Sequence, residues 1–233
     1  MKLTWIGQSG YVLETAYTKI VIDPYLSDVV NRVAGRPRLV EAPFAPGELR
    51  ANAVICTHDH LDHLDVDAVV EMDKDMLFIT TCQGREKLTD MGFAKVLAMK
   101  EGQAVLVGDM TVRAVCANHT VEAFGVIIEA EGQTLYFSGD TLYDEKLFAV
   151  ADFCPDLAFI CINGKLGNMN VQEAAIVAKK IGAKVNIPNH YGMFASNTED
   201  PTLFTDQVEN GRILEYNQTY DTADLLREEH SYV

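Results

Sequence analysis

The chain is 233 residues long, about half of its residues are apolar, and its formal net charge at pH 7 is −15. A chain of this length can bury one sizeable core, and we expect a single domain over residues 1–233. The strong negative charge repels a phosphate backbone, which argues against long nucleic acids as partners.

The sequence shows no feature of a membrane or secreted protein. It contains no run of about 20 apolar residues, the length that crosses a bilayer. The N-terminus lacks the charged region and apolar stretch of a secretory signal peptide. The five cysteines are an odd number without close pairing, and most lie in apolar, strand-like runs. We therefore expect a cytoplasmic protein with reduced, buried thiols and no membrane partner.

Most of the predicted regular structure is β-strand. Short runs rich in β-branched and aromatic residues, bounded by Gly, Asp and Pro, indicate strands. They span residues 3–6, 11–14, 19–22, 53–56, 77–80, 104–107, 111–116, 124–129, 134–138, 157–162 and 184–187. A turn at residues 131–133 predicts a hairpin of the strands on either side of it. Residues 35–47 hold three of the seven prolines and are predicted to form a surface loop or flap.

The clearest predicted helix spans residues 171–181. Asn170 is a good N-cap with Glu173 three residues later, the apolar residues recur with a helical period, and Gly182 can end the helix. Further helices are predicted at residues 66–72, 85–91, 144–151 and 203–209. Strands and helices interleave without a dinucleotide-binding glycine fingerprint, which suggests an α/β fold of two sheets sandwiched between helices.

Three of the six histidines lie within six positions, in the segment Thr-His-Asp-His-Leu-Asp-His that follows the predicted strand at 53–56. Imidazole and carboxylate groups are preferred ligands of Zn²⁺, Mn²⁺ and Fe²⁺. Alternate positions in an extended turn can face one ion, so this loop can address two neighbouring metals. The other interpretation, a polar surface loop, is disfavoured because more candidate ligands follow other strands. The candidates in this segment are His58, His60, Asp62 and His63.

Three further candidates stand after other predicted strands. His119 and His190 would each be an ordinary polar residue if taken alone, but together with the cluster they are predicted ligands. Asp140 lies in a turn of small residues that lets a carboxylate approach two ions. Its alternative role is to cap a helix near residue 144. We expect Asp140 to bridge two metals.

The ordered set of these residues resembles the metallo-β-lactamase superfamily, and the resemblance spans nearly the whole chain. It implies an αββα four-layer sandwich of two mixed sheets flanked by helices, with two divalent transition-metal ions along one edge. Zn²⁺ or Mn²⁺ is expected there, with Fe²⁺ as an alternative. By position, the resemblance implies that the first metal is held by His58, His60 and His119 and the second by Asp62, His63 and His190. It also implies that Asp140 bridges the two metals and that Asp23 orients the cluster from behind the ligands.

Other segments resemble the branch that contains L-ascorbate-6-phosphate lactonase. They are residues 162–164, 167–170, 173–175 and 188–194 with Asp200-Pro201, and residues 7–10 and 22–24 agree with them. The chain is much shorter than that lactonase, so segments that carry substrate contacts there can be missing here. The resemblance therefore implies the chemistry more firmly than the substrate.

The ligand set implies a hydrolytic mechanism. Two ions lower the pKa of a shared water to about 7, and the bridging hydroxide attacks a carbonyl. The catalytic residues in this interpretation are Asp62, Asp140 and His190. The chain has no Gly-x-Ser-x-Gly elbow and no cysteine in a nucleophile motif, which argues against a covalent intermediate.

A small, anionic lactone or ester is the expected substrate. A small-molecule phosphodiesterase and a non-catalytic metal-binding protein are the alternatives. Redox di-iron relatives usually have Glu at the position of His60. The histidine found there favours hydrolysis.

Substrate contacts are predicted less specifically than the ligands. A glycine-containing loop carries Asn163, Lys165 and Asn168, and Tyr191 follows a predicted ligand. The competing interpretation of this loop is a plain turn before the helix, which already explains Asn170. A group of arginines near the proline-rich loop can attract an anion or be ordinary surface charge; its members are Arg32, Arg36, Arg38 and Arg50. His230 is predicted to take no part, and a homo-oligomer stays open.

Overall fold

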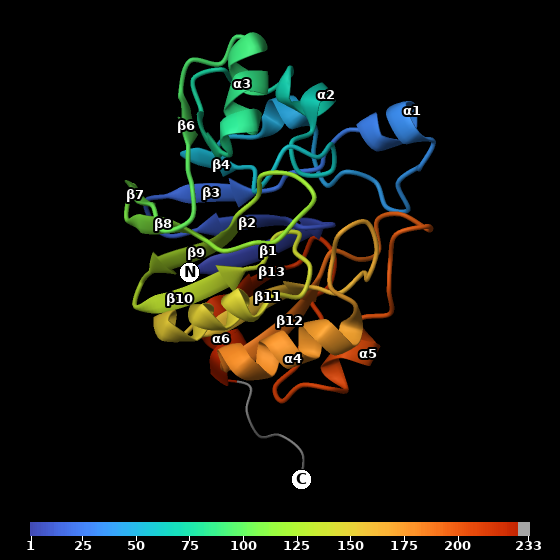
Figure 1. Cartoon of the computed structure of the whole chain (residues 1–233). Helices are drawn as coiled ribbons and strands as arrows, with labels where there is room; N and C mark the ends of the chain where they lie inside the picture. Colours follow the sequence, from blue (N-terminus) through green and yellow to red (C-terminus); the bar gives the residue numbers. More distant parts are fainter. Residues whose placement is uncertain (228–233) are drawn as a thin grey trace.

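Two β-sheets pack face to face in the computed structural model, which describes residues 1–227 (Figure 1). The two faces of each strand explain this arrangement, because successive side chains alternate between them. In β3 (Lys19–Ile22), Ile20 and Ile22 belong to the core between the sheets, whereas Val21 packs with the helices on the outer face. Successive side chains of a strand point to opposite faces, so a strand that is apolar on both faces needs a cover on each side. The four-layer αββα sandwich is thus confirmed.

The first sheet has seven strands in the order β13-β1-β2-β3-β4-β5-β6. Neighbouring strands are antiparallel from β13 to β3 and parallel from β3 to β6. The other strands of this sheet are β1 (Lys2–Gly7), β2 (Gly10–Glu14), β4 (Ala53–Ile55), β5 (Leu77–Thr80), β6 (Val96–Ala98) and β13 (Thr219–Asp221).

The second sheet has six strands in the order β12-β11-β10-β9-β8-β7. The predicted hairpin is confirmed, because β9 and β10 pair antiparallel across the turn at 131–133. Strands β10, β11 and β12 are parallel. The bounds are β7 (Ala104–Val107), β8 (Met110–Val115), β9 (Gly125–Ala130), β10 (Gln133–Phe137), β11 (Leu157–Cys161) and β12 (Val185–Asn189).

Helices cover the outer face of each sheet (Figure 1). Helices α1 (Val29–Ala34), α2 (Val66–Val69) and α3 (Cys82–Asp90) lie on the side of the seven-stranded sheet. Helices α4 (Val171–Ile181), α5 (Thr202–Thr205) and α6 (Thr222–Arg227) lie on the side of the other sheet. Two short 3₁₀ helices complete the fold, η1 (Pro46–Glu48) and η2 (Glu145–Phe153). Helix α4 has its predicted bounds, with the reciprocal Asn170–Glu173 cap at its start.

Several predicted elements differ from the structure. The segment predicted as a helix at 144–151 is the 3₁₀ helix η2, which buries Leu147 and Val150 on one face. The helices predicted at 66–72 and 203–209 stop after one turn, at Val69 and Thr205. The sequence prediction missed β6, β13, α1 and α6. Each of these has only three to six residues, too few to show a period.

The cysteines are free thiols, but not all are buried. Cys56 and Cys161 are buried, whereas Cys154 is exposed. The prediction of buried thiols is therefore wrong for Cys154, which ends η2 in a left-handed conformation with φ 47° instead of lying in a strand. Within residues 1–227, none of the helices has the length and apolar character needed to cross a bilayer.

Strand direction brings many loops to one edge of the sandwich. In the first sheet, β1 and β3 are both antiparallel to β2, and β4 is parallel to β3. In the second sheet, β8 and β10 are both antiparallel to β9, and β12 runs parallel to β10 through β11. Within each sheet, therefore, these strands end at the same edge, and the loops after them can share one site.

Candidate metal centre

The predicted ligands lie in the loops at these strand ends. The segment 57–63 follows β4, His119 follows β8, Asp140 follows β10, and His190 directly follows β12. Their side chains form two adjacent groups of potential ligand atoms. Side chains that are far apart in the sequence thus converge because their strands share a direction.

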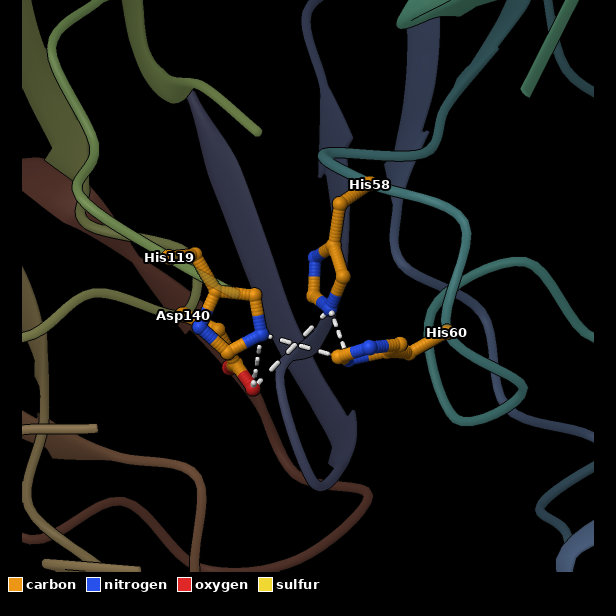
Figure 2. A group of neighbouring side chains, drawn as sticks. All are labelled: His58, His60, His119 and Asp140. Atoms are coloured by element: carbon orange, nitrogen blue, oxygen red, sulfur yellow. Dashed lines mark hydrogen bonds and ion pairs between the residues drawn. The ribbon is translucent and has the colours of Figure 1, made fainter. Parts of the chain in front are cut away.

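The first group consists of His58, His60, His119 and Asp140 (Figure 2). Nδ1 of His60 lies 3.0 Å from Nε2 of His58 and 3.2 Å from Nε2 of His119. Oδ2 of Asp140 lies 4.0 Å and 3.9 Å from the same two Nε2 atoms. The four donor atoms lie within 4.8 Å of one another, a spacing that can hold a metal ion.

The second group consists of Asp62, His63 and His190. Oδ2 of Asp62 lies 3.4 Å from Nε2 of His190 and 3.8 Å from Nε2 of His63. Both imidazoles are buried, whereas the Asp62 side chain is 18% exposed. The second group therefore has one side open to solvent.

Asp140 lies between the two groups. Its Oδ2 faces His58 and His119, and its Oδ1 lies 3.2 Å from Nε2 of both His63 and His190. Each carboxylate oxygen therefore faces a different group. This is the arrangement that a bridging carboxylate requires.

Asp23 lies behind the cluster and contacts His63 and Thr57. Its Oδ2 lies 2.8 Å from Nδ1 of His63, and its Oδ1 accepts a hydrogen bond from the Thr57 backbone N–H. The Thr57 hydroxyl donates to Asp23 Oδ2 and lies 3.2 Å from Nδ1 of His58. With both Nδ1 atoms engaged in this way, the Nε2 atoms of the two histidines are turned toward Asp140.

His119 is oriented by the loop before α4. Its Nδ1 lies 3.0 Å from the carbonyl oxygen of Gly167 and can donate to it. Gly167 has φ +92°, and a Cβ atom there would lie 3.0 Å from the His119 ring. Glycine is needed at this position both for the backbone conformation and for the close approach.

The groups of the centre differ in their protonation. Burial holds the pKa of His58 well below its ordinary value, which keeps its lone pair available. Burial alone would raise the pKa of Asp140, but the neighbouring imidazoles, first of all His190, hold it well below the usual range. Burial also opposes protonation of His190, yet the carboxylates of Asp140 and Asp62 raise its pKa to about 9. A cation bound to the second group would therefore compete with protons for these imidazoles.

The residues present fit a metal. The buried atoms His63 Nε2 and Asp140 Oδ1 lie 3.2 Å apart, yet neither makes a hydrogen bond of regular geometry among residues 1–227. Three imidazole nitrogens of the first group face one another at 3.0–3.2 Å, where a shared cation would satisfy all three. Imidazole and carboxylate donors suit Zn²⁺, Mn²⁺ and Fe²⁺.

Two residues in the centre were not among the predicted functional residues. Gln8, in the turn between β1 and β2, places Nε2 2.8 Å from Oδ2 of Asp62. Thr57 connects Asp23 to His58, as described above. Both stand within motifs visible in the sequence, residues 7–10 and 57–63, but neither is an obvious metal ligand. Backbone strain marks the same edge, since Gln8, Asp23 and His190 all have positive φ, of 51°, 44° and 63°.

The predicted substrate residues occupy different environments. Asn163 is buried and donates to Oδ1 of Asn197, and it accepts a hydrogen bond from Asn168, so the two predicted asparagines hold the loop together. Lys165 is exposed, with Nζ 3.5 Å from the carbonyl oxygen of Ser196. Tyr191 is buried against Trp5, with ring centroids 4.9 Å apart.

Three of the four arginines near the proline-rich loop have partners within the chain. Arg32 forms a two-point ion pair with Asp67 on α2. Arg38 lies over the Tyr25 ring and donates to three backbone carbonyls. Arg50 donates to two carbonyls beside it. These contacts favour a structural role. His230, predicted to take no part, lies outside the described residues.

Comparisons with known proteins agree with this geometry. Residues 18–191 match the model of the β-lactamase superfamily domain. A UPF0173 metal-dependent hydrolase from Ruegeria sp. (strain TM1040) is 31% identical over 214 residues, which cover 83% of this chain and 87% of the relative.

Solved structures share the fold over nearly their whole length. A possible metal-dependent hydrolase from Veillonella parvula DSM 2008 has a TM-score of 0.80 at 21% identity, covering 94% of this chain and 98% of that one. An isothiocyanate hydrolase from Delia radicum gut bacteria has a TM-score of 0.79 at 21% identity, covering 95% and 99%. The family model spans most of the chain, and the sandwich with histidines and aspartates at its edge agrees with it. The chain therefore belongs to the metallo-β-lactamase superfamily and, within it, to the UPF0173 metal-dependent hydrolases.

Proposed function

We propose that this protein is a dinuclear hydrolase that opens a small, anionic lactone or ester. The observation that carries the proposal is the position of Asp140, whose two carboxylate oxygens face different groups of ligand atoms. A single-metal site needs no carboxylate between two sets of imidazoles. A bridged pair of ions does.

In this proposal, His58, His60 and His119 hold one Zn²⁺ or Mn²⁺ ion and Asp62, His63 and His190 hold the other. When bound, such a pair supplies a water of lowered pKa and polarises the group under attack. Asp23 keeps His63 oriented, and Gly167 keeps His119 oriented. The protein thus contributes a rigid cage whose donor atoms are aimed before the substrate arrives.

Asp62 is the proposed group for proton transfer. Its side chain is 18% exposed, whereas that of Asp140 is 6% exposed, so Asp62 stands nearer to solvent and to an arriving substrate. A carboxylate at the mouth can take the proton of the attacking water and return it to the departing alkoxide. His190, 3.4 Å from Asp62, helps to hold this carboxylate in place.

A carbonyl carbon is the proposed electrophile. The resemblance of several loops to the L-ascorbate-6-phosphate lactonase branch supports a lactone. The structurally similar isothiocyanate hydrolase supports attack at carbon, because the electrophilic atom of an isothiocyanate is carbon. The exposed ammonium of Lys165, on the loop that orients His119, suits a negatively charged substrate.

The net charge and the cysteines bear on the partners and the cellular compartment. We propose a small-molecule substrate, no nucleic-acid or membrane partner, and a reducing, cytoplasmic compartment. The net charge of −15 and the five free cysteines support this proposal.

The test combines metal analysis with a substrate panel. Purified protein is expected to carry close to two transition-metal ions per chain and to hydrolyse small lactones or esters faster than phosphodiesters. Turnover of bis-aryl phosphates alone would instead assign a phosphodiesterase. Metal binding without turnover of any substrate would leave a metal-binding protein.

A further inference from the structure

Gln8 is a fully buried polar residue inside the metal centre. It stands in the turn between β1 and β2 with φ 51°, directly after Gly7 with φ 95°. The turn is held in place from outside: the indole N–H of Trp5 donates to the carbonyl oxygen of Gln8, at 3.0 Å. A left-handed backbone at a residue other than glycine is strained and persists where its surroundings enforce it. The fold therefore holds the Gln8 side chain toward the centre.

The amide of Gln8 contacts two members of the second group. Its Nε2 lies 2.8 Å from Oδ2 of Asp62 and 3.1 Å from Nε2 of His190. The Asp62 carboxylate fixes the orientation of the amide, because the opposite orientation would place an amide oxygen against a carboxylate oxygen. Gln8 is thus a hydrogen-bond donor to Asp62.

The other half of the amide is unused. Oε1 of Gln8 is buried and has no hydrogen-bond partner among residues 1–227. An unpaired buried carbonyl destabilises the folded chain. If only stability mattered at this position, an apolar side chain of similar size would avoid the unpaired carbonyl. The amide of Gln8 is therefore better explained by the hydrogen bond that its N–H donates to Asp62.

We propose that Gln8 is a positioning residue of the second metal site, with its amide N–H fixing the Asp62 carboxylate beside His190. Asp62 needs such a restraint because it is the most open member of its group and belongs to a loop, not to a strand. The inference rests on the proposed dinuclear site. It concerns this chain's own residues, and metal affinity measures it without any substrate.

The experiment compares wild type with Gln8→Met, which keeps the length of the side chain and removes the donor. Stepwise Zn²⁺ affinities are measured by competition with a chromophoric chelator, and thermal unfolding is measured on metal-free protein. We expect the affinity of one site to fall about 10–100-fold, the range for lost hydrogen bonds to metal ligands. The other site and the metal-free melting temperature are expected to stay near wild type. Gln8→Asn, whose shorter amide cannot reach Asp62, is expected to give the same selective loss if Gln8→Met does not fold.

Ser9→Ala is the matched control. Ser9 is the next residue of the same turn, is also buried, and contacts Asn189 at 3.2 Å instead of the ligands. It should keep both affinities. The proposal would be overturned if both Zn²⁺ affinities of Gln8→Met stayed within two-fold of wild type. It would also be overturned if both affinities fell equally and the metal-free melting temperature dropped, because that result indicates a structural role. Wild-type protein that binds one ion only would refute the dinuclear site itself.

Discussion

Oδ2 of Asp23 lies 2.8 Å from Nδ1 of His63, and both side chains are buried. The same carboxylate accepts hydrogen bonds from the backbone N–H and the hydroxyl of Thr57. A single residue at the end of β3 thus fixes the side-chain direction of His63 and the start of the segment that carries four potential ligands.

Asp23→Asn is expected to weaken metal binding about 10–100-fold, the usual cost of losing a group that orients a metal ligand. The amide can still contact Thr57, but it no longer offers a charged acceptor to His63. Metal content after dialysis and turnover of the best lactone or ester measure the effect. Asp109→Asn is the control, since Asp109 accepts from Thr15 on the surface. Equal metal content in Asp23→Asn and wild type would contradict an orienting role.

Asp140→Ala is expected to lose at least one of two bound ions. The substitution removes the carboxylate that faces both groups, and His63 and His190 then lose a charged neighbour at 3.2 Å. Elemental analysis of the purified variant measures this directly. If metal content does not change, Asp140 does not bridge.

Gly167→Ala is expected to disturb His119. The new Cβ would lie 3.0 Å from the imidazole, and φ +92° strains any side chain. Gly102→Ala separates the two causes, because Gly102 has φ +85° with nothing within 4 Å of the new Cβ. Both variants should lose about 1 kcal/mol or more of unfolding free energy from backbone strain. A drop in metal affinity is expected for Gly167→Ala alone, and equal affinities would show that the His119 contact is dispensable.

Metal-free protein is expected to lose stability as pH rises from about 6.5 to about 9. The pKa of His190 in the folded chain is about 9, above its ordinary value of 6.5, because Asp140 and Asp62 stabilise the imidazolium. Its contribution is therefore fully present below pH 6.5 and is lost as pH rises through 9. Metal-loaded protein should show the opposite trend, since metal ligation requires the neutral imidazole. Thermal unfolding with chelator and with Zn²⁺ across this range checks both trends. His190→Gln should make the metal-free curve shallower but not flat, because, despite burial, Asp140, Asp23 and Asp62 also raise the pKa of His63 well above its ordinary value. A flat wild-type curve would contradict the expectation.

Local sequence patterns were sufficient to predict the segment of potential metal ligands and the helix with the clearest caps. The spacing of His58, His60, Asp62 and His63 predicts metal ligation from four residues, three His and one Asp, within six positions. The Asn170 cap and Gly182 likewise predict α4 with its observed bounds, because capping depends on neighbours in the chain. Elements of three to six residues such as β6 and α1 are too short to show a periodic signal.

The sequence by itself indicated the ligand types, the interleaving of strands and helices that suggests two sheets between helices, and the superfamily. Only the tertiary structure decided which oxygen of Asp140 faces which histidines, and that Gln8 enters the centre. It also placed Tyr191, a predicted substrate residue, against Trp5. The physical reason is that side-chain direction depends on strand register and on backbone conformations such as the positive φ of Gln8 and His190. These are set by packing between segments far apart in the chain, which no local pattern records.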